Sequence, residues 1–559
     1  MDARGMMPPG DGPGAPLDRA GRAAALVVPL AVFCVAFVLL RDWVVDDAGI
    51  TFAYARNAAA GHGLVSQPGQ LPVEGYSNFL WLAALLPFFE LRVFDATWTP
   101  KLVSLALVVG TFWLLGSLLP RRLRLSTTAT VLALTLIAAN PAFAIWTVSG
   151  LENALMAFLV ALEWSLLAAW SDVTAPAPRL AVPLGLTASA IALTRPDGLL
   201  YCVAAPAILI VVGRARRAAL RDAAAAFTVA AVVFAAFLVF RWTTFHDLFP
   251  NAYWAKGGPG ARSAAELMTL APDAAGAWIA LHHAIGSKLA GWVAVFLVMV
   301  PLRAALGERR GRPGRLSRAQ EATGLLYACT AAEFVLLPPD WMSEYRFATP
   351  FVLVSLPWLA WCTQDVFVAA TSIYPRRRWA AAAAVALLAA AAFAVDARRM
   401  RAFRAHPTVS VDLVAKALAR PYNDLAARLG LTQASLLAPD LGGLLMQSRL
   451  TVIDLVGLCD RTIARSIGKD QPRFYAYVFE ERKPTFIHTH DYWTWLANLD
   501  ADPRFRRDYE AIREYVDPDV ERRFGRRMMS GDYVRKSALP AGRPMTPGDL
   551  RAILEVPED

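Results

Sequence analysis

Long apolar runs recur between residues 23 and 397, separated by short polar and charged segments. Most of the runs have about 15–20 residues, which is the length of a helix that crosses the hydrocarbon core of a bilayer. The pattern predicts membrane-spanning helices at Ala23–Leu40, Lys101–Leu119, Thr127–Ile145, Asn153–Trp170, Leu180–Leu193, Leu199–Val212, Ala223–Phe240, Leu289–Leu302, Thr323–Leu337, Phe351–Val366 and Trp379–Val395.

One further run, Phe79–Leu91, is short and contains Pro87. The basic residues between the runs form compact clusters, at Arg121–Arg124, Arg214–Arg221, Arg303–Arg318 and Arg376–Arg378. If the short run lies at the surface or only dips into the bilayer, all of these clusters fall on the cytoplasmic side, as the positive-inside rule requires. We therefore predict about eleven spans, with the N-terminus inside and the C-terminus outside.

The composition agrees with a multi-spanning membrane protein. Of the 559 residues, 56% are hydrophobic and only 18% are charged, and the mean hydropathy is +0.39. These values exclude an ordinary soluble protein of this size. The net charge is +10, but the basic residues sit in short clusters between apolar runs and are not spread over one face, so nucleic acid is not an expected partner. The five cysteines show neither a disulfide framework nor a metal-binding spacing.

The chain divides into three parts. Residues 1–22 are rich in Gly and Pro and are expected to be a disordered cytoplasmic N-terminus. Residues 23–397 form the transmembrane part, with a first outer loop at 42–78. Residues 398–559 are charged and contain short apolar runs between helical stretches, which predict a small extracytoplasmic α/β domain. The short runs are Ala434–Leu437, Thr451–Val456 and Thr485–Ile487.

Two adjacent carboxylates, Asp46 and Asp47, open the first outer loop. Like charges placed side by side at a membrane surface are costly, because repulsion and burial both raise their pKa. The alternative is a loop whose acids are simply solvated. The loop closes with a second polar group, which contains Glu74, Tyr76 and Asn78.

The predicted topology places further polar residues at span ends on the same outer face. Carboxylates, cations and amides gathered on one face indicate an active site at the membrane surface. These residues are Glu152, Arg195, Asp197, Asn251, Lys256, Asp340 and Arg346.

Such a site suits a sugar carried on a polyprenyl phosphate. The leaving group is already an anion, so it needs cations rather than an acid, and Arg195, Lys256 and Arg346 would bind the donor phosphate. The incoming hydroxyl needs a base, and Asp46 or Asp47 would serve. The remaining polar residues would bind substrate, namely Glu74, Tyr76, Asn78, Glu152, Asp197, Asn251 and Asp340.

Structural roles remain open for several of these residues. Ser149 and Glu152 have the spacing of a capping box, and Arg195 and Asp197 flank a proline that could simply break a helix. Lys256 could be a cation that reaches from a span end to the membrane surface.

One pair of histidines has the alternation of a strand. His488 and His490 would point to the same side and could hold a metal ion. A single pair of this kind is weak support, so we assign no metal ligand from the sequence. The acidic pair at Asp46 and Asp47 could hold a divalent cation as readily as it could accept a proton.

Six motifs in order resemble a family of bacterial GT-C membrane glycosyltransferases that includes the mycobacterial terminal β-(1→2) arabinofuranosyltransferase. They are Asp46-Asp47-Ala48 with Tyr54–Asn57 and Gly61–Gly63, Val73–Asn78, Thr147–Glu152, Arg195-Pro196-Asp197, Pro250-Asn251 with Ala255-Lys256, and Asp340–Met342 with Arg346. The resemblance covers the membrane part and, more faintly, Val452–Leu458.

The resemblance implies a polytopic α-helical GT-C-like fold with a small C-terminal α/β domain. It also implies a polyprenyl-phosphate-linked sugar donor, a glycan or glycolipid acceptor of the cell envelope, and a catalytic acid in the first outer loop. The enzyme would lie in the bacterial plasma (inner) membrane, with the active site on the extracytoplasmic side. Arabinofuranose is the favoured sugar.

Two departures separate the chain from common members of this family. Pro338-Pro339 stands where Gly-Gly is common, and Asp197 stands where Glu is common. They point to family membership rather than to the same substrate. The alternative function is a flippase or transporter for a lipid-linked sugar. Transporters usually carry ionisable residues near the bilayer midplane and internal repeats, whereas here those residues are at span ends and no repeat is visible.

Overall fold

A computed structural model of the chain describes residues 17–256, 316–337, 342–525, 527–540 and 547–554. The chain forms two compact units, each built from separate segments. The helical unit contains Met1–Trp43, Thr97–Leu238 and Ala265–Thr408. The composite unit contains Val44–Ala96, Val239–Ala264 and Val409–Asp559.

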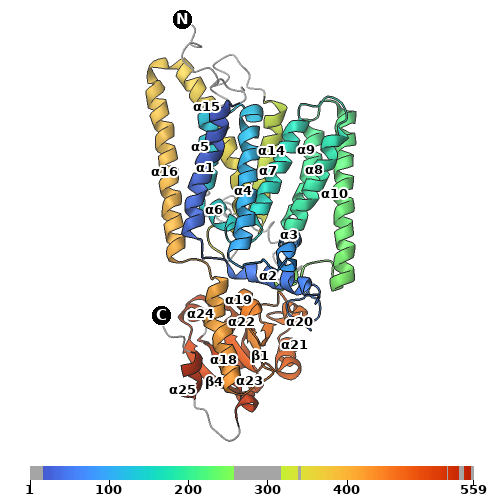
Figure 1. Cartoon of the computed structure of the whole chain (residues 1–559), viewed down its shortest axis with the longest axis vertical. Coiled ribbons are helices and arrows are strands. Elements are labelled where there is room, and N and C mark those ends of the chain that lie inside the picture. The colour runs from blue at the N-terminus through green and yellow to red at the C-terminus, as the bar shows by residue number, and fades with distance from the viewer. Residues whose placement is uncertain (1–16, 257–315, 338–341, 526, 541–546, 555–559) are drawn as a thin grey trace. The chain divides into compact units, whose positions relative to one another are not determined.

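Long helices that pack side by side make up the helical unit (Figure 1). Neighbouring pairs include α1 with α5, α4 with α7, and α7 with α8. The helices are α1 (Arg19–Leu39), α4 (Trp98–Leu118), α5 (Thr127–Ala139), α6 (Pro141–Thr147), α7 (Asn153–Trp170), α8 (Pro178–Thr194), α9 (Leu199–Val212), α10 (Arg216–Phe245), α14 (Arg318–Leu336), α15 (Thr349–Ile373) and α16 (Arg378–Ala405).

Within the described residues, six helices are long and apolar enough to cross a membrane, or up to seven if one bent pair counts as a single span. The chain is therefore a multi-pass membrane protein, as predicted, while the number of about eleven spans is not confirmed. Helices α8 and α9 are apolar but short, with 17 and 14 residues. The predicted span Leu289–Leu302 lies outside the described residues.

The bent pair corrects one predicted span. The run Thr127–Ile145 forms two helices, α5 and α6, which meet at an angle of 61°. The side chain of Asn140 accepts a hydrogen bond from the amide of Ala142 at 3.1 Å, and Pro141 occupies the first turn of α6. Asparagine at the N-cap followed by proline starts a new helix, which is why the run breaks there.

The short run that follows the first outer loop forms α3 (Phe79–Glu90). Its 12 residues extend about 18 Å at 1.5 Å per residue, which is less than the roughly 30 Å hydrocarbon core. By length it agrees with the prediction that this run does not cross the bilayer.

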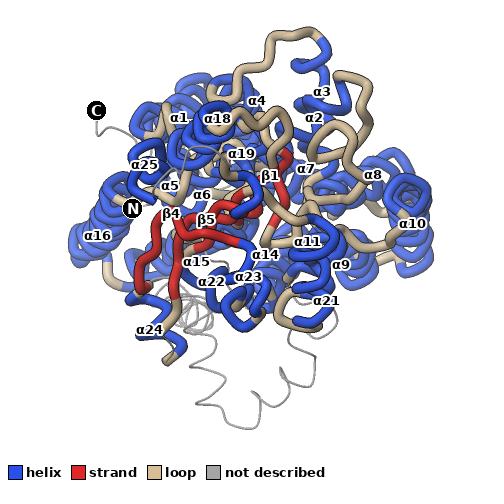
Figure 2. The backbone as a smooth tube through the Cα atoms, turned by 90° about the horizontal axis from the view of Figure 1, so that it is seen from below, coloured by secondary structure: helices blue, strands red, loops and turns tan. Residues whose placement is uncertain are grey.

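A five-stranded mixed sheet lies within the composite unit, in the order β2-β1-β3-β5-β4 (Figure 2). Strands β2, β1 and β3 are parallel, and β5 and β4 run antiparallel to their neighbours. This confirms the predicted α/β class, and the first three strands form at the three short apolar runs. The strands are β1 (Ser435–Ala438), β2 (Thr451–Asp454), β3 (Phe486–Thr489), β4 (Tyr509–Val516) and β5 (Met529–Arg535).

Helices from all three segments belong to the composite unit together with this sheet. They are α2 (Asp46–Ala59), α3, α11 (Asn251–Ala255), α17 (Val411–Val414), α18 (Arg420–Arg428), α19 (Gly442–Gln447), α20 (Arg461–Ser466), α21 (Gln471–Ala476), α22 (Asp491–Ala497), α23 (Pro503–Asp508), α24 (Pro518–Phe524) and α25 (Pro547–Leu554).

Both faces of the sheet are buried, in two separate cores. Side chains alternate along each strand, so Leu436 and Phe486 enter one core while Leu437 and Ile487 enter the other. The first core also contains residues of the first outer loop, including Ile50, Tyr54 and Tyr76. The loop and the C-terminal region therefore share one hydrophobic core.

The compact units do not follow the predicted boundaries. The predicted change at residues 397 and 398 falls inside α16, which continues to Ala405. The first outer loop, predicted as part of residues 23–397, groups with the C-terminal region. Its backbone pairs there directly, because the amide of Asp46 donates to Val409 and the amide of Val411 donates to Val44, both at 3.0 Å.

Glycine is required where α2 meets the start of α19. A Cβ atom added to Gly442 would lie 1.7 Å from the backbone oxygen of Asp46, and one added to Gly49 would lie 2.7 Å from the backbone of Gly442. Backbone atoms cannot move aside as the end of a flexible side chain can. The two segments can therefore approach this closely only with glycine at both positions.

The substitution Gly442→Ala should destabilise the composite unit by at least about 1–3 kcal/mol, the usual cost of overpacking. The midpoint of thermal unfolding of the purified protein is the measurement. Gly116→Ala is the control, because its Cβ would meet only the Cβ of Ala25, at 3.7 Å. Equal midpoints for the two variants would contradict the argument.

Candidate active site

The two adjacent acids of the first outer loop lie in different surroundings. Asp46 is only 4% exposed, and its two carboxylate oxygens accept hydrogen bonds from the amides of Gly442 at 2.8 Å and Gly443 at 2.7 Å. Burial raises the pKa of Asp46 to about 7, although these two hydrogen bonds oppose the shift. The side chain of Asp46 therefore connects α2 to the start of α19 through these two hydrogen bonds.

Asp47 is half-buried and follows Asp46 in the first turn of α2. Successive residues of a helix point about 100° apart, so the two carboxylates diverge. Because Asp46 is committed to α19, Asp47 is the member of the pair with the more open side chain. The sequence alone left the two acids equivalent.

Glu74 forms a buried ion pair with an arginine that the sequence analysis did not single out. Nε of Arg241 lies 2.7 Å from Oε2 of Glu74, and Nη2 donates to Oε1 at 3.1 Å. Burial raises the pKa of Glu74 to about 7, and the charge of Arg241 opposes the shift. This pair joins the first outer loop to the end of α10.

Three more predicted substrate-binding residues hold the composite unit together. The side-chain amide of Asn251 donates to the carbonyls of Gly457 at 2.6 Å and Leu458 at 3.0 Å. Asn78 accepts a hydrogen bond from Thr51 at 3.0 Å. Tyr76 packs edge-on against Tyr54, with ring centroids 5.0 Å apart. These contacts give each residue a structural role, and their contact with substrate stays a prediction.

In the helical unit, Arg195 and Arg346 gather around one aromatic ring. Their guanidinium carbons lie 4.3 and 4.7 Å from the ring centroid of Phe347, within the range of cation–π contacts. Arg195 is 3% exposed and donates two hydrogen bonds to Asp197, at 3.0 and 2.6 Å. Its remaining Nη1 is buried and has no hydrogen-bond partner among the described residues. A buried guanidinium with an unused donor fits an anionic ligand.

Glu152 is buried at the start of α7, and its negative charge acts on Arg195. The capping-box alternative for Ser149 and Glu152 is wrong, because Glu152 itself is the N-cap residue and its side chain makes no cap hydrogen bond. The next residue, Asn153, donates to the backbone carbonyl of Arg346 at 2.8 Å. The start of α7 thus supports the arginine pair.

The remaining two predicted site residues are Lys256 and Asp340. Lys256 is exposed at the end of α11 in the composite unit. Asp340 lies outside the described residues.

Two further polar features of the helical unit were not predicted. Tyr201 donates to Glu333 at 2.8 Å, and Glu333 acts electrostatically on both Arg195 and Asp197. Lys101 is 0% exposed, and its ammonium donates to the carbonyls of Leu40, Trp43 and Val148 at 2.9, 2.7 and 2.8 Å. The signal in the sequence was, in each case, a charged residue in an apolar run, namely Glu333 and Lys101.

Comparison with solved structures decides the fold. The chain resembles the oligosaccharyltransferase AglB from Archaeoglobus fulgidus, solved with an inhibitory peptide and a dolichol-phosphate, with a TM-score of 0.53 over 94% of this chain and 76% of that one. It also resembles ArnT from Cupriavidus metallidurans, bound to undecaprenyl phosphate, with a TM-score of 0.50 over 92% and 98%. The sequence identities are 12% and 14%.

The chain has the GT-C fold. This confirms the predicted architecture, a helical membrane part with a C-terminal α/β domain. At the level of sequence, residues 419–534 match a family described as a domain of unknown function, DUF8728. No curated protein sequence matches the chain significantly. Because the sequence identities are only 12% and 14%, the similarity establishes the fold alone and does not identify the sugar.

The stability of the composite unit should fall as the pH rises from about 4 to about 7. Burial raises the pKa of Asp46, Glu74 and Asp454 to about 7, whereas such carboxyls titrate near about 4 in an unfolded chain. Between these values the folded protein holds protons that the unfolded chain has released, so raising the pH favours unfolding.

The measurement is the thermal midpoint as a function of pH. Glu74→Gln should flatten the dependence, because it removes one of the three groups, whereas Asp424→Asn, at an exposed position of α18, should leave it unchanged. A midpoint that rises with pH across this window would refute the assignment.

Proposed function

We propose that the protein is a glycosyltransferase that moves one sugar from a polyprenyl-phosphate carrier to a cell-envelope glycan or glycolipid. The GT-C fold supports the class, since both structures it resembles contain polyprenyl-type phosphates. The observation that carries the proposal is the buried arginine pair on Phe347, with its unused donor on Arg195. The order of motifs in the sequence favours arabinofuranose and transfer at the outer face of the plasma membrane.

In the proposed reaction, the acceptor hydroxyl attacks the anomeric carbon of the donor sugar. The bond between that carbon and the phosphate oxygen breaks, and the polyprenyl phosphate leaves with the bonding electrons. The hydroxyl proton passes to a carboxylate base. Because the leaving group gains negative charge, cations must stabilise it as the bond breaks.

Asp47 is the base in this proposal. It is the more open acid of the pair, and α2, on which it stands, is fixed by the hydrogen bonds of Asp46 to α19. A base that must take a proton at a defined point benefits from a rigid support. Asp46 then acts as a positioning residue rather than as a proton acceptor.

Arg195 and Arg346 are the proposed phosphate ligands, and Lys256 is a third cation with the same role. Arg195 is oriented by its two hydrogen bonds to Asp197, which leaves Nη1 for a phosphate oxygen. Guanidinium groups bind phosphate in a defined orientation, which suits a donor whose anomeric carbon must be aligned.

The substitution Asp47→Asn should lower transfer by about 100–10,000-fold, because it removes the base. The thermal midpoint should stay near that of the wild type. Asp46→Asn should lower both transfer and the midpoint, since an amide nitrogen cannot accept the hydrogen bond that the carboxylate oxygen accepts. The exposed Asp42 supplies the control, Asp42→Asn, which should change neither.

Transfer is measured as consumption of carrier-linked sugar from a panel of polyprenyl-phosphate donors carrying arabinofuranose, mannose, glucose or galactose, with an acceptor mixture, with and without chelator. Full activity of Asp47→Asn would overturn its assignment as the base. If the well-folded wild type consumed no donor yet moved lipid-linked sugar across liposomes, the protein would be a transporter instead.

The substitution Arg195→Lys should raise the KM for the donor and lower kcat/KM by about 10–100-fold. It keeps the charge but loses the planar fork, and a hydrogen bond to a charged group is worth about 1.5–3 kcal/mol. Arg122→Lys is the matched control, because Arg122 also pairs with an aspartate in the helical unit, Asp172. Equal donor kinetics for the two variants would remove Arg195 from the phosphate site.

A further inference from the structure

Three metal-ligating side chains meet at the carboxyl edge of the sheet in the composite unit. Asp440 follows β1, His488 lies in β3, and His490 follows β3. Strands β1 and β3 are adjacent and parallel, with Leu436 opposite Phe486. Their carboxyl ends therefore open at the same place, which is where α/β sheets commonly bind ligands.

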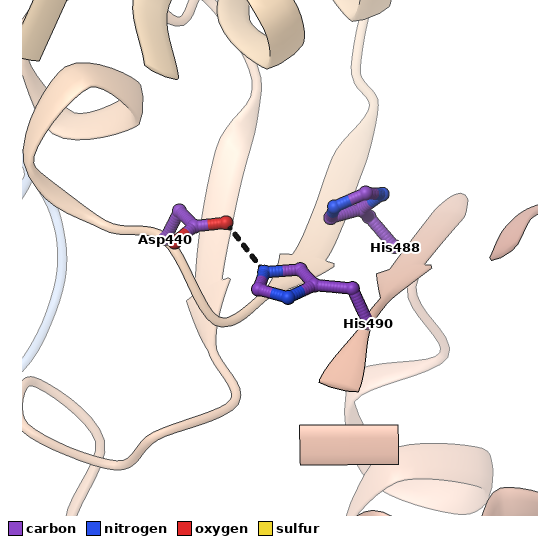
Figure 3. A group of neighbouring side chains, drawn as sticks. All are labelled: Asp440, His488 and His490. Carbon is purple, nitrogen blue, oxygen red and sulfur yellow. Dashed lines mark hydrogen bonds and ion pairs between the residues drawn. The ribbon is translucent and has the colours of Figure 1, made fainter. Parts of the chain in front are cut away.

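The donor atoms of Asp440, His488 and His490 all lie within 4.8 Å of one another. Nε2 of His490 is 2.8 Å from Oδ2 of Asp440, and the two imidazole rings are 5.4 Å apart between centroids (Figure 3). The side chains of Asp440 and His490 are 26% and 25% exposed, so an ion could reach them from solvent, whereas His488 is largely buried, at 11%. Ligand atoms of a zinc site lie about 2.0–2.2 Å from the ion, so these three side chains would draw closer together on binding one.

A second observation shows that His488 is held in the orientation of a ligand. Its Nδ1 lies 2.7 Å from Oδ1 of the buried Asp532, which stands directly opposite in the antiparallel ladder between β3 and β5. Tyr422 also donates to Asp532, at 2.6 Å, and Arg513 pairs with it. Because Tyr422 and Arg513 also donate to Asp532, a neutral His488 that donates its Nδ1 hydrogen to this carboxylate would offer the lone pair of Nε2 to an ion.

This arrangement has the second-sphere pattern of protein metal sites. A histidine that binds a metal through one nitrogen nearly always donates the other N–H to a carboxylate or carbonyl. His490 shows a similar contact, because its Nδ1 lies 3.1 Å from the carboxylate of Asp491 while Nε2 faces Asp440. Neither contact could be recognised from the spacing of the histidines.

We propose that Asp440, His488 and His490 bind one divalent transition-metal ion, for which Zn²⁺ is the best match. Two imidazoles and one carboxylate suit zinc, whereas calcium and magnesium prefer sites made of oxygen ligands alone. Three protein ligands leave one tetrahedral position for water or for an oxygen of a bound molecule.

A bound ion would stabilise the segment whose amides bind Asp46. Asp440 stands two residues before Gly442, whose amide binds Asp46. An ion held by Asp440 and β3 would fix the segment between β1 and α19, and so the support of α2. This role needs no contact between the ion and a sugar, and it stands whether or not the proposed transferase function holds.

The competing interpretation is a plain ion pair between His490 and Asp440, with His488 serving only to bury Asp532. It predicts no zinc affinity. Metal content therefore separates the two interpretations without any measurement of activity.

The experiment uses the full chain purified through a tag without histidine, stripped with chelator and dialysed against Zn²⁺, Mn²⁺ or Ca²⁺. The wild type should retain about one zinc per chain by elemental analysis, and zinc should raise its thermal midpoint. His490→Ala and Asp440→Asn should lose the zinc, and Asp532→Asn should weaken binding by about 10–100-fold. The control His406→Ala, at an exposed histidine outside the cluster, should bind as the wild type does.

Folding of each variant is monitored by its thermal midpoint without metal. Less than about a tenth of a zinc per wild-type chain, or equal zinc in wild type and ligand variants, would overturn the proposal. So would retention of calcium in place of zinc. Since the readout is metal content, a failed transferase assay leaves this result unaffected.

Discussion

The hydrogen bonds between the carboxylate of Asp46 and the amides of Gly442 and Gly443 are the constraint on which the composite unit depends. They join positions 396 and 397 residues apart in the chain, and they exist only because glycine lets α2 approach the start of α19. A buried carboxylate is costly unless its oxygens are satisfied. Here the two amides satisfy both oxygens, and the core around Ile50 and Tyr54 closes over the contact.

This contact explains why two adjacent acids have separate roles. Consecutive helical positions cannot point the same way, so fastening Asp46 to α19 leaves Asp47 turned elsewhere, in the more open position. Other polar contacts hold the same unit together: Glu74 pairs with Arg241 of α10, and Asn251 donates to the carbonyl of Gly457. Several residues that the sequence suggested as substrate ligands therefore also have structural roles in the composite unit.

The sequence predicted what depends on local pattern. The apolar runs predicted the helices and the first three strands. A helix or strand that is buried on all sides must be apolar along its length, so its position is visible in the sequence. The break at Asn140 and Pro141 was also a local signal, although the apolar run on both sides concealed it. The sequence could not separate Asp46 from Asp47, since that distinction rests on amides in a distant segment. For the same reason it could not find Asp532 behind His488, which only the pairing of β3 with β5 brings opposite.

The order in which its three segments are synthesised limits when the composite unit can fold. Its core needs residues 44–96, the end of α10 and residues 409–559, while the segments between them belong to the helical unit. Closing such long connections costs entropy that only the finished core repays. Residues 44–96 are synthesised long before the segment that begins α19, whose amides bind the carboxylate of Asp46. Because the contact of Asp46 holds α2 on α19, the position of Asp47 depends on the folding of both segments. In the proposed reaction, Asp47 would therefore accept a proton at a defined point only after α19 has folded.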